Sequence, residues 1–131
     1  MTTVAEYARK EAIVSCKPGA TLREASAIMA ERKVGSILVL DEARRLLGIF
    51  TERDLVRALA SGADPDRDRV DDYMTRRVIT ASPYESLVSA SQKMLEHGIR
   101  HLPVVDSSGR VIGIISMRDV LRALFSSHEF P

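Results

Sequence analysis

The chain has 131 residues, 45% of them hydrophobic, and its 19 basic and 18 acidic residues leave a formal net charge of +1. This length fits one compact domain or two small halves that share a core. The balanced charge excludes the broad positive field by which many proteins attract DNA or an anionic membrane. The lone Cys16 allows no intramolecular disulfide, and no apolar run approaches the roughly 18 residues of a membrane helix. Because residues 1–11 also lack the layout of a secretion signal, we expect a cytoplasmic protein.

The first half of the chain predicts a strand, a helix, two strands and a second helix. Residues 13–14 form a short apolar strand, and Thr21 followed by Glu24 is a capping-box pattern that begins a helix. Residues 36–40 and 46–50 are apolar almost throughout, as in strands whose sheet is covered on both faces. The second helix begins after Thr51. The side chains expected to pack are Leu22, Ala25, Ile28 and Met29 on the first helix and Leu55, Val56 and Leu59 on the second.

The second half predicts the same order of elements after a polar loop at 61–68. A strand is expected at 78–80, and Ser82, Pro83 and Glu85 predict the start of a helix that Gly98 ends in a left-handed cap. Two strands at 102–105 and 111–115 follow, and the last helix begins after Ser116. The side chains expected to pack are Leu87, Ala90, Met94 and Leu95 on the first helix and Val120, Leu121 and Leu124 on the second.

The two halves are an internal repeat. A shift of 65 positions aligns residues 13–59 with 78–124 without a gap, and the leader sequences VAEY at 4–7 and VDDY at 70–73 also match. We therefore divide the chain into one unit at 1–62 and a second at 63–131, each with its own leader. Identical pairs include Pro18 and Pro83, Leu22 and Leu87, Gly48 and Gly113, Arg53 and Arg118, and Asp54 and Asp119.

The repeated stretches GIFTERD at 48–54 and GIISMRD at 113–119, with HLPVVD at 101–106, resemble the cystathionine-β-synthase (CBS) domain, and the tandem pair resembles a Bateman module. The resemblance implies an α/β fold of two units packed sheet to sheet about a pseudo-twofold axis. It also implies a non-enzymatic sensor that binds AMP, ADP, ATP or a related adenosine compound in clefts between the units. We expect AMP as the regulatory ligand, no required cofactor and no metal, a homodimer, and an unidentified regulated protein partner.

Elementary chemistry supports a nucleotide at the repeated turn. A helix that begins after Thr51 or Ser116 has unpaired backbone N–H groups and a dipole that favour a phosphate. The hydroxyl group and the neighbouring arginine add a hydrogen bond and a charge, and the carboxylate of Asp54 or Asp119 can accept from both ribose hydroxyls. The alternative is that Thr-x-x-Asp and Ser-x-x-Asp are only helix caps.

The resemblance also assigns residues to each cleft, with the adenine held largely by the opposite unit. For Arg100 and His101 the alternative is a solvated strand edge or a dimer contact. The second-unit site is expected to be better charged, and its residues are Ser116, Arg118, Asp119, Arg100, His101, Ile13 and Val34. The first-unit site is expected to contain Thr51, Arg53, Asp54, Ser36, Thr75, Val78 and Ile99.

Other functions have less support in the residues. Cys16 is expected to be an inert core thiol, and His97, His101 and His128 lack the spacing of a helical metal pair. No phosphate-cradling G-x-x-x-x-G-K-[ST] loop is present. Two alternatives stay open. One is a ligand-free dimerisation module that uses residues 4–10 and the last helix with Phe125 and Phe130. The other is nucleic-acid binding through the basic stretches at 44–47 and 75–77.

Overall fold

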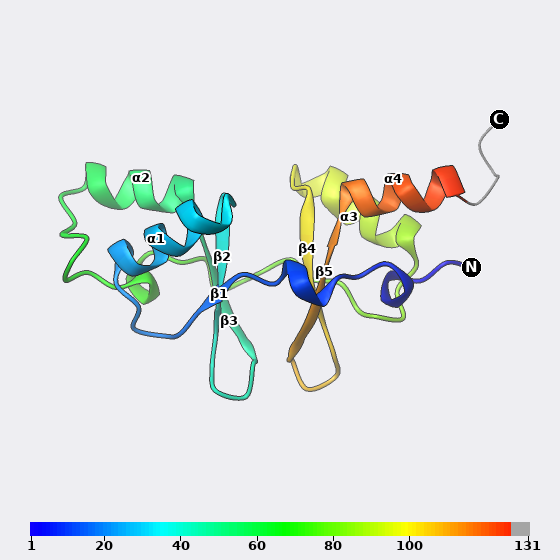
Figure 1. Ribbon diagram of the computed structural model, residues 1–131, viewed down its shortest axis with the longest axis horizontal. Coiled ribbons are helices and arrows are strands. Elements are labelled where there is room, and N and C mark those ends of the chain that lie inside the picture. The colour runs from blue at the N-terminus through cyan, green and yellow to red at the C-terminus, as the bar shows by residue number, and fades with distance from the viewer. Residues whose placement is uncertain (127–131) are drawn as a thin grey trace. The chain divides into compact units, whose positions relative to one another are not determined.

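The computed structural model describes residues 1–126, which form two packing units (Figure 1). Val14–Val78 make one unit, and Met1–Ile13 together with residues 79–126 make the other. His128 and Phe130 lie outside the described residues. Within residues 1–126, no helix is both long and apolar enough to cross a membrane.

The unit Val14–Val78 has a three-stranded sheet in the order β1-β2-β3, in which β1 runs parallel and β3 antiparallel to β2. Thr21 caps α1 by accepting from the N–H of Glu24 at 3.1 Å, and Lys33 ends the helix in the left-handed conformation. The hairpin turn lies at the end of the sheet away from α2 (Figure 1). The elements are β1 Ser15–Cys16, α1 Leu22–Arg32, β2 Ser36–Leu40, β3 Leu46–Thr51, α2 Glu52–Ala60 and the 3-10 helix η3 Val70–Asp72.

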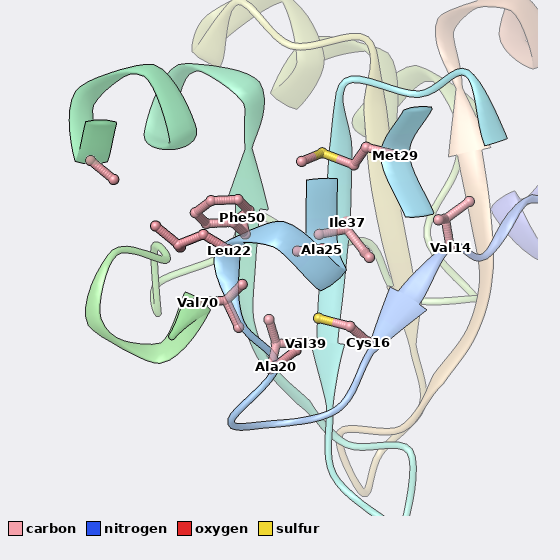
Figure 2. Close-up of a cluster of buried hydrophobic side chains, with 11 residues drawn as sticks. Val14, Cys16, Ala20, Leu22, Ala25, Met29, Ile37, Val39, Phe50 and Val70 are labelled. Carbon is pink, nitrogen blue, oxygen red and sulfur yellow. The ribbon is translucent and has the colours of Figure 1, made fainter. Parts of the chain in front are cut away.

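The core of this unit lies between α1 and the sheet, where Leu22, Ile37 and Phe50 are almost fully buried (Figure 2). Cys16 belongs to the same cluster, and burial together with Asp71 and Glu24 raises the pKa of its thiol to about 11. The thiol is therefore protonated at neutral pH, which confirms the prediction that Cys16 packs in the core.

The other unit repeats this arrangement around an antiparallel pair, β4 and β5. Gly98 ends α3 in the left-handed conformation, as its position in the sequence predicted. The elements are the 3-10 helices η1 Val4–Glu6 and η2 Lys10–Ala12, α3 Leu87–His97, β4 His101–Val105, β5 Val111–Ser116 and α4 Met117–Ser126.

The strand predicted at 78–80 is reduced to a single bridge between Ala81 and Val104. In the first repeat the N–H of Leu38 donates to the carbonyl of Val14 at 2.9 Å, just before β1. The residue at the corresponding place in β4 is Pro103, which has no N–H to donate. The ladder therefore cannot extend toward residue 79, although the mixed α/β class is confirmed.

Each leader packs against the repeat that it does not precede. The N–H of Val4 donates to the carbonyl of Glu85, and Arg9 exchanges two backbone hydrogen bonds with Ile114 of β5. The second leader likewise joins the first repeat, where Val70 donates to Ala20. The division at residue 62 therefore describes the sequence repeat, whereas the packing units divide after Ile13 and after Val78.

Two details of the helices correct the sequence predictions. The helix α3 begins at Leu87 with Ser86 as its N-cap, because Ser82 and Glu85 instead close a turn in which the N–H of Ser82 donates to Oε1 of Glu85. On the closing helices Leu55, Val120 and Leu124 pack against the cores as predicted, and Ala58 and Ala123 are buried beside them. The predicted packing residues that are exposed instead are Val56, Leu59, Leu95 and Leu121.

Gly48 allows the second leader to cross β3. A Cβ atom at this position would lie 2.6 Å from Sδ of Met74 and 2.9 Å from the carbonyl oxygen of Thr75. The first leader crosses β5 at Gly113, where a Cβ atom would meet the Cβ of Ala8 at 3.2 Å. The repeated glycines thus make room for the leaders.

Candidate functional site

The turn from Ser116 to Asp119 joins β5 to α4 and buries a carboxylate. Oδ2 of Asp119 accepts from the N–H of Ser116 at 2.9 Å and from its hydroxyl at 2.7 Å. The N–H of Asp119 donates back to Oγ of Ser116 at 3.1 Å. Ser116 and Asp119 are both buried, with Asp119 only 2% exposed. The turn therefore places a charged group inside the protein, where it needs partners.

Two arginines supply those partners. Nη1 of Arg122 donates to Oδ1 of Asp119 at 3.2 Å from the next turn of α4. Nε of Arg9 lies 3.3 Å from the same oxygen, and its side chain is 42% exposed. Because both guanidinium groups reach water in part, the site combines a buried anion with accessible positive charge.

Arg100 brings further positive charge to this turn, and His101 lies next to it in the chain. His101 is the register partner of Ser116 across the β4–β5 ladder, and the carbonyl of Arg100 accepts from the N–H of Met117 at 2.9 Å. Burial and the charge of Arg100 lower the pKa of His101, with smaller contributions from Arg9 and Arg118, while Asp119 raises it. An anion bound here would relieve that like-charge repulsion.

The corresponding turn in the first repeat has the same backbone and fewer charges. The N–H of Thr51 donates to Oδ2 of Asp54 at 2.9 Å, and the N–H of Asp54 donates to Oγ1 of Thr51 at 3.1 Å. Ser36 is the register partner of Thr51, as His101 is of Ser116. Among residues 1–126, no side chain forms an ion pair or hydrogen bond with Oδ1 of Asp54, which is half-buried. This turn is the more open of the two.

Both turns are helix caps in this structure, as the capping interpretation predicted. The helix N-termini are also less available than the sequence suggested, because the N–H of Glu52 donates to Gly35 at 3.0 Å and that of Met117 to Arg100. A phosphate at either turn would therefore depend more on side-chain cations than on backbone N–H groups. Capping and ribose binding are compatible, since the serine hydroxyl can rotate away from a carboxylate oxygen.

The remaining predicted residues are placed as follows. Thr75 exchanges backbone hydrogen bonds with Ile49 beside the first turn, and Val78 is half-buried in the same unit. Ile13 is half-buried in the unit that holds Asp119. Val34 lines a surface cavity of about 440 Å³ with Glu52 and belongs to the unit of Asp54, not that of Asp119.

Ile99 packs against the core of the unit that holds Asp119 and not that of Asp54. The roles of all these residues in binding stay predictions. Within the described residues, no group of three or more His, Cys, Asp or Glu side chains is placed to hold a metal ion.

Comparison with known proteins identifies the family. The sequence pattern of the family described as CBS domain matches residues 4–61 and 70–126. The chain belongs to the CBS domain family. An uncharacterised 17.7 kDa protein of Acidianus ambivalens is 41% identical over 127 residues, which is 97% of this chain and 76% of that protein. The resemblance found in the sequence is thus confirmed.

Solved structures of CBS pairs have the same fold. The CBS domain pair of protein MJ0100, in complex with 5′-methylthioadenosine and S-adenosyl-L-methionine, superposes with a TM-score of 0.79. It is 30% identical, and the match covers 98% of this chain and 99% of that one. The protein CBSX2 in complex with AMP gives a TM-score of 0.84 at 27% identity, with 98% and 100% covered.

Several relatives are longer than this CBS pair. The chain spans 61% of an uncharacterised protein of Methanopyrus kandleri and 42% of one of Methanocaldococcus jannaschii. It also matches 24% of the length of a homoserine O-acetyltransferase of Methanococcoides burtonii, at 35% identity. CBS pairs similar to this chain are therefore also found within larger proteins, including an enzyme.

Sequence reasoning missed Arg9 and Arg122 as neighbours of Asp119. Arg122 lies three residues from Asp119 on a helix, a spacing at which side chains meet, so the sequence alone contained this signal. Arg9 was hidden because the leader was assigned to the other unit. Aligning the leaders at VAEY and VDDY pairs Arg9 with Thr75, and the structure shows that both residues bridge to equivalent strands.

Proposed function

We propose that the protein is a regulatory module that binds an adenosine-containing ligand and is not an enzyme. The observation that carries this proposal is the almost fully buried Asp119, flanked by Arg9 and Arg122 and close to the cation-surrounded His101. A carboxylate of this kind suits a ribose, and the cations suit a phosphate. The adenosine compounds bound by MJ0100 and CBSX2 support the same ligand class.

Within this proposal each side chain has a role. Asp119 accepts from the ribose hydroxyls, and Ser116, Arg118, Arg100 and His101 bind the phosphate. The first-unit site uses Asp54 for ribose and Thr51, Arg53 and Ser36 for phosphate, with fewer charges. The residues proposed to contact adenine are Ile13 and Val34 at the Asp119 site and Thr75, Val78 and Ile99 at the Asp54 site.

AMP is the proposed ligand, because a single phosphate suits the compact group of cations around His101. The regulated partner is proposed to be a separate protein or a further domain, since similar CBS pairs lie within longer proteins. We place the protein in the cytoplasm as a homodimer.

The test is calorimetric titration with AMP, ADP, ATP, S-adenosylmethionine and NAD, together with melting curves. A ligand at 100 times its Kd stabilises the folded state by roughly 2.7 kcal/mol per site. For a chain of this size the expected rise in Tm is about 5–10 °C. No heat and no shift with any of these compounds at millimolar concentration would overturn the proposal.

A ligand-free dimerisation module is the second candidate. The observation in its favour is that each of the two closing helices exposes apolar side chains, since exposed apolar surface often marks an interaction site. Their exposed fractions are 66% for Val56, 46% for Leu59, 46% for Leu121 and 67% for Phe125. This function predicts a stable dimer whose Tm does not respond to adenosine compounds.

A further inference from the structure

Both carboxylate oxygens of Asp119 have neighbours within the protein. Oδ2 accepts two hydrogen bonds from Ser116, and Oδ1 lies within 3.3 Å of both Arg9 and Arg122. A ribose that bound to this carboxylate through two hydroxyl groups would need two acceptor positions. It would therefore have to displace at least one of the present donors.

Of the groups around Asp119, the guanidinium group of Arg9 has the poorest hydrogen bonding. Its Nε is buried and has no hydrogen-bond partner among residues 1–126, although it lies 3.3 Å from Oδ1 of Asp119. The two groups attract each other by charge, but the N–H is not aligned with the carboxylate, and a buried donor without an acceptor is costly. A better acceptor for Arg9 would relieve that cost.

The backbone of Arg9 is held in place while its side chain reaches water. Its N–H donates to the carbonyl of Ile114 at 2.9 Å, and its carbonyl accepts from Ile114 at 3.0 Å. The exposed fraction of the side chain is 42%. A long side chain on a fixed backbone can move its guanidinium group between two nearby acceptors without disturbing the leader.

The first repeat has the same backbone bridge without the cation. Thr75 takes the place of Arg9 and exchanges hydrogen bonds with Ile49 at 2.9 Å in both directions. In the described chain, Asp54 has no ion pair of the kind that Asp119 has. The two ribose-binding candidates therefore differ in one respect that matters for a ligand: only Asp119 is already neutralised by the leader.

We infer that Arg9 is an internal counter-ion of Asp119 that makes this site select nucleotides over nucleosides. This inference rests on the proposed binding of adenosine ligands at Asp119. A nucleoside that displaces Arg9 leaves the guanidinium group without an anion. A nucleotide supplies one, because its phosphate accepts from the displaced Arg9 in a charge-assisted bond. The Asp54 site, with Thr75 in the same place, discriminates less.

The test compares adenosine with AMP in the variant Arg9→Thr, which copies Thr75. All proteins carry Asp54→Ala so that one site is measured by calorimetry. We expect Arg9→Thr to strengthen adenosine binding by about two- to fivefold, the range of a partly exposed ion pair. AMP binding is expected to weaken by about tenfold or more, because a charged donor to the phosphate is lost. Both changes lower the preference for AMP over adenosine.

Two further variants separate the effect of the lost charge from the effect of misfolding. Arg9→Gln keeps most of the side-chain length without the charge and should behave as Arg9→Thr, whereas Arg9→Lys should keep most of the preference for AMP. Melting curves and circular dichroism confirm that each variant is folded. If the affinities for adenosine and AMP change by the same factor in Arg9→Thr and Arg9→Gln, Arg9 does not select and the inference is wrong.

The outcome also separates this inference from the proposed function. AMP binding that is lost in Asp119→Ala but keeps its ratio to adenosine in the Arg9 variants contradicts only the role of Arg9. Absence of AMP binding, or AMP binding that is unchanged in Asp119→Ala, contradicts the proposed ribose site itself and with it the inference.

Discussion

His101 lies directly opposite Ser116 in the β4–β5 ladder, and this places an imidazole beside the buried carboxylate of Asp119 and its arginines. Burial and the charge of Arg100 keep the pKa of His101 below its ordinary value of 6.5. The ring is therefore neutral at pH 7 when no ligand is bound. A phosphate nearby would stabilise its protonated form and raise that pKa.

The first prediction is that AMP binding takes up a proton at His101. Affinity should increase as the pH falls from 7 toward the pKa of the free protein, because only the complex is protonated in that window. The phosphate of AMP itself titrates near pH 6, so the parent must be compared with His101→Gln. A pH profile of Kd that is the same in both proteins would contradict the prediction.

The same lowered pKa gives a second expectation for the unliganded protein. In the unfolded chain His101 binds a proton below about pH 6.5, whereas in the folded protein it resists protonation. The free energy of unfolding should therefore decrease as the pH falls below 6.5, and His101→Gln should lose part of this dependence. Denaturant unfolding of both proteins between pH 5 and pH 7.5 measures the difference.

A third prediction concerns the leaders. Gly48→Ala should destabilise the protein by about 1–3 kcal/mol, the usual cost of overpacking, because its Cβ would meet Met74 and the backbone of Thr75. Gly113→Ala is the matched control and should cost less, since the nearest atom to its new Cβ is the Cβ of Ala8, at 3.2 Å. Equal changes in the free energy of unfolding would show that the leader does not pack closely at Gly48.

The two hairpins at 36–51 and 101–116 and the turns that follow them could be predicted from the sequence, because each depends on local pattern. The hydrogen bonds of Thr51 with Asp54 and of Ser116 with Asp119 join residues three apart. Arg9 and Asp119 are 110 positions apart, and nothing in their local sequence links them. The position of Arg9 depends on where the leader packs, which is decided by the burial of Val4 and its hydrogen bond to Glu85. The loss of the strand at 78–80 also depends on a distant residue, Pro103.

A fourth prediction concerns assembly. If the closing helices form the contact between two copies, Val56→Lys or Leu121→Lys should produce a monomer at micromolar concentration, because each places a charge on an exposed apolar face. Ile112→Lys is the control, since Ile112 is 41% exposed but lies on β5. Light scattering distinguishes the two states. A parent protein that is already monomeric at this concentration would contradict the proposed homodimer.

The last prediction separates the ribose-binding role of the repeated turn from its role as a cap. Asp119→Ala should weaken AMP binding at its site at least tenfold, because two hydrogen bonds to a charged acceptor are lost, each worth about 1.5–3 kcal/mol in favourable cases. It should also lower the free energy of unfolding by about 2–3 kcal/mol, since a cap and the partner of Arg9 and Arg122 are removed together. Asp54→Ala loses only the cap and should cost about 1 kcal/mol.

The two readouts must be measured on the same variants, because a cap alone predicts lower stability with binding intact. Asp119→Asn is the intermediate case: its amide oxygen still accepts, but the negative charge that holds Arg9 and Arg122 is gone. If Asp119 binds the ribose, Asp119→Ala should bind AMP with a higher Kd than the parent even under conditions where the variant is fully folded. If Asp119→Ala and Asp54→Ala both bind AMP as the parent does and only melt earlier, the two turns serve as helix caps and the ribose lies elsewhere.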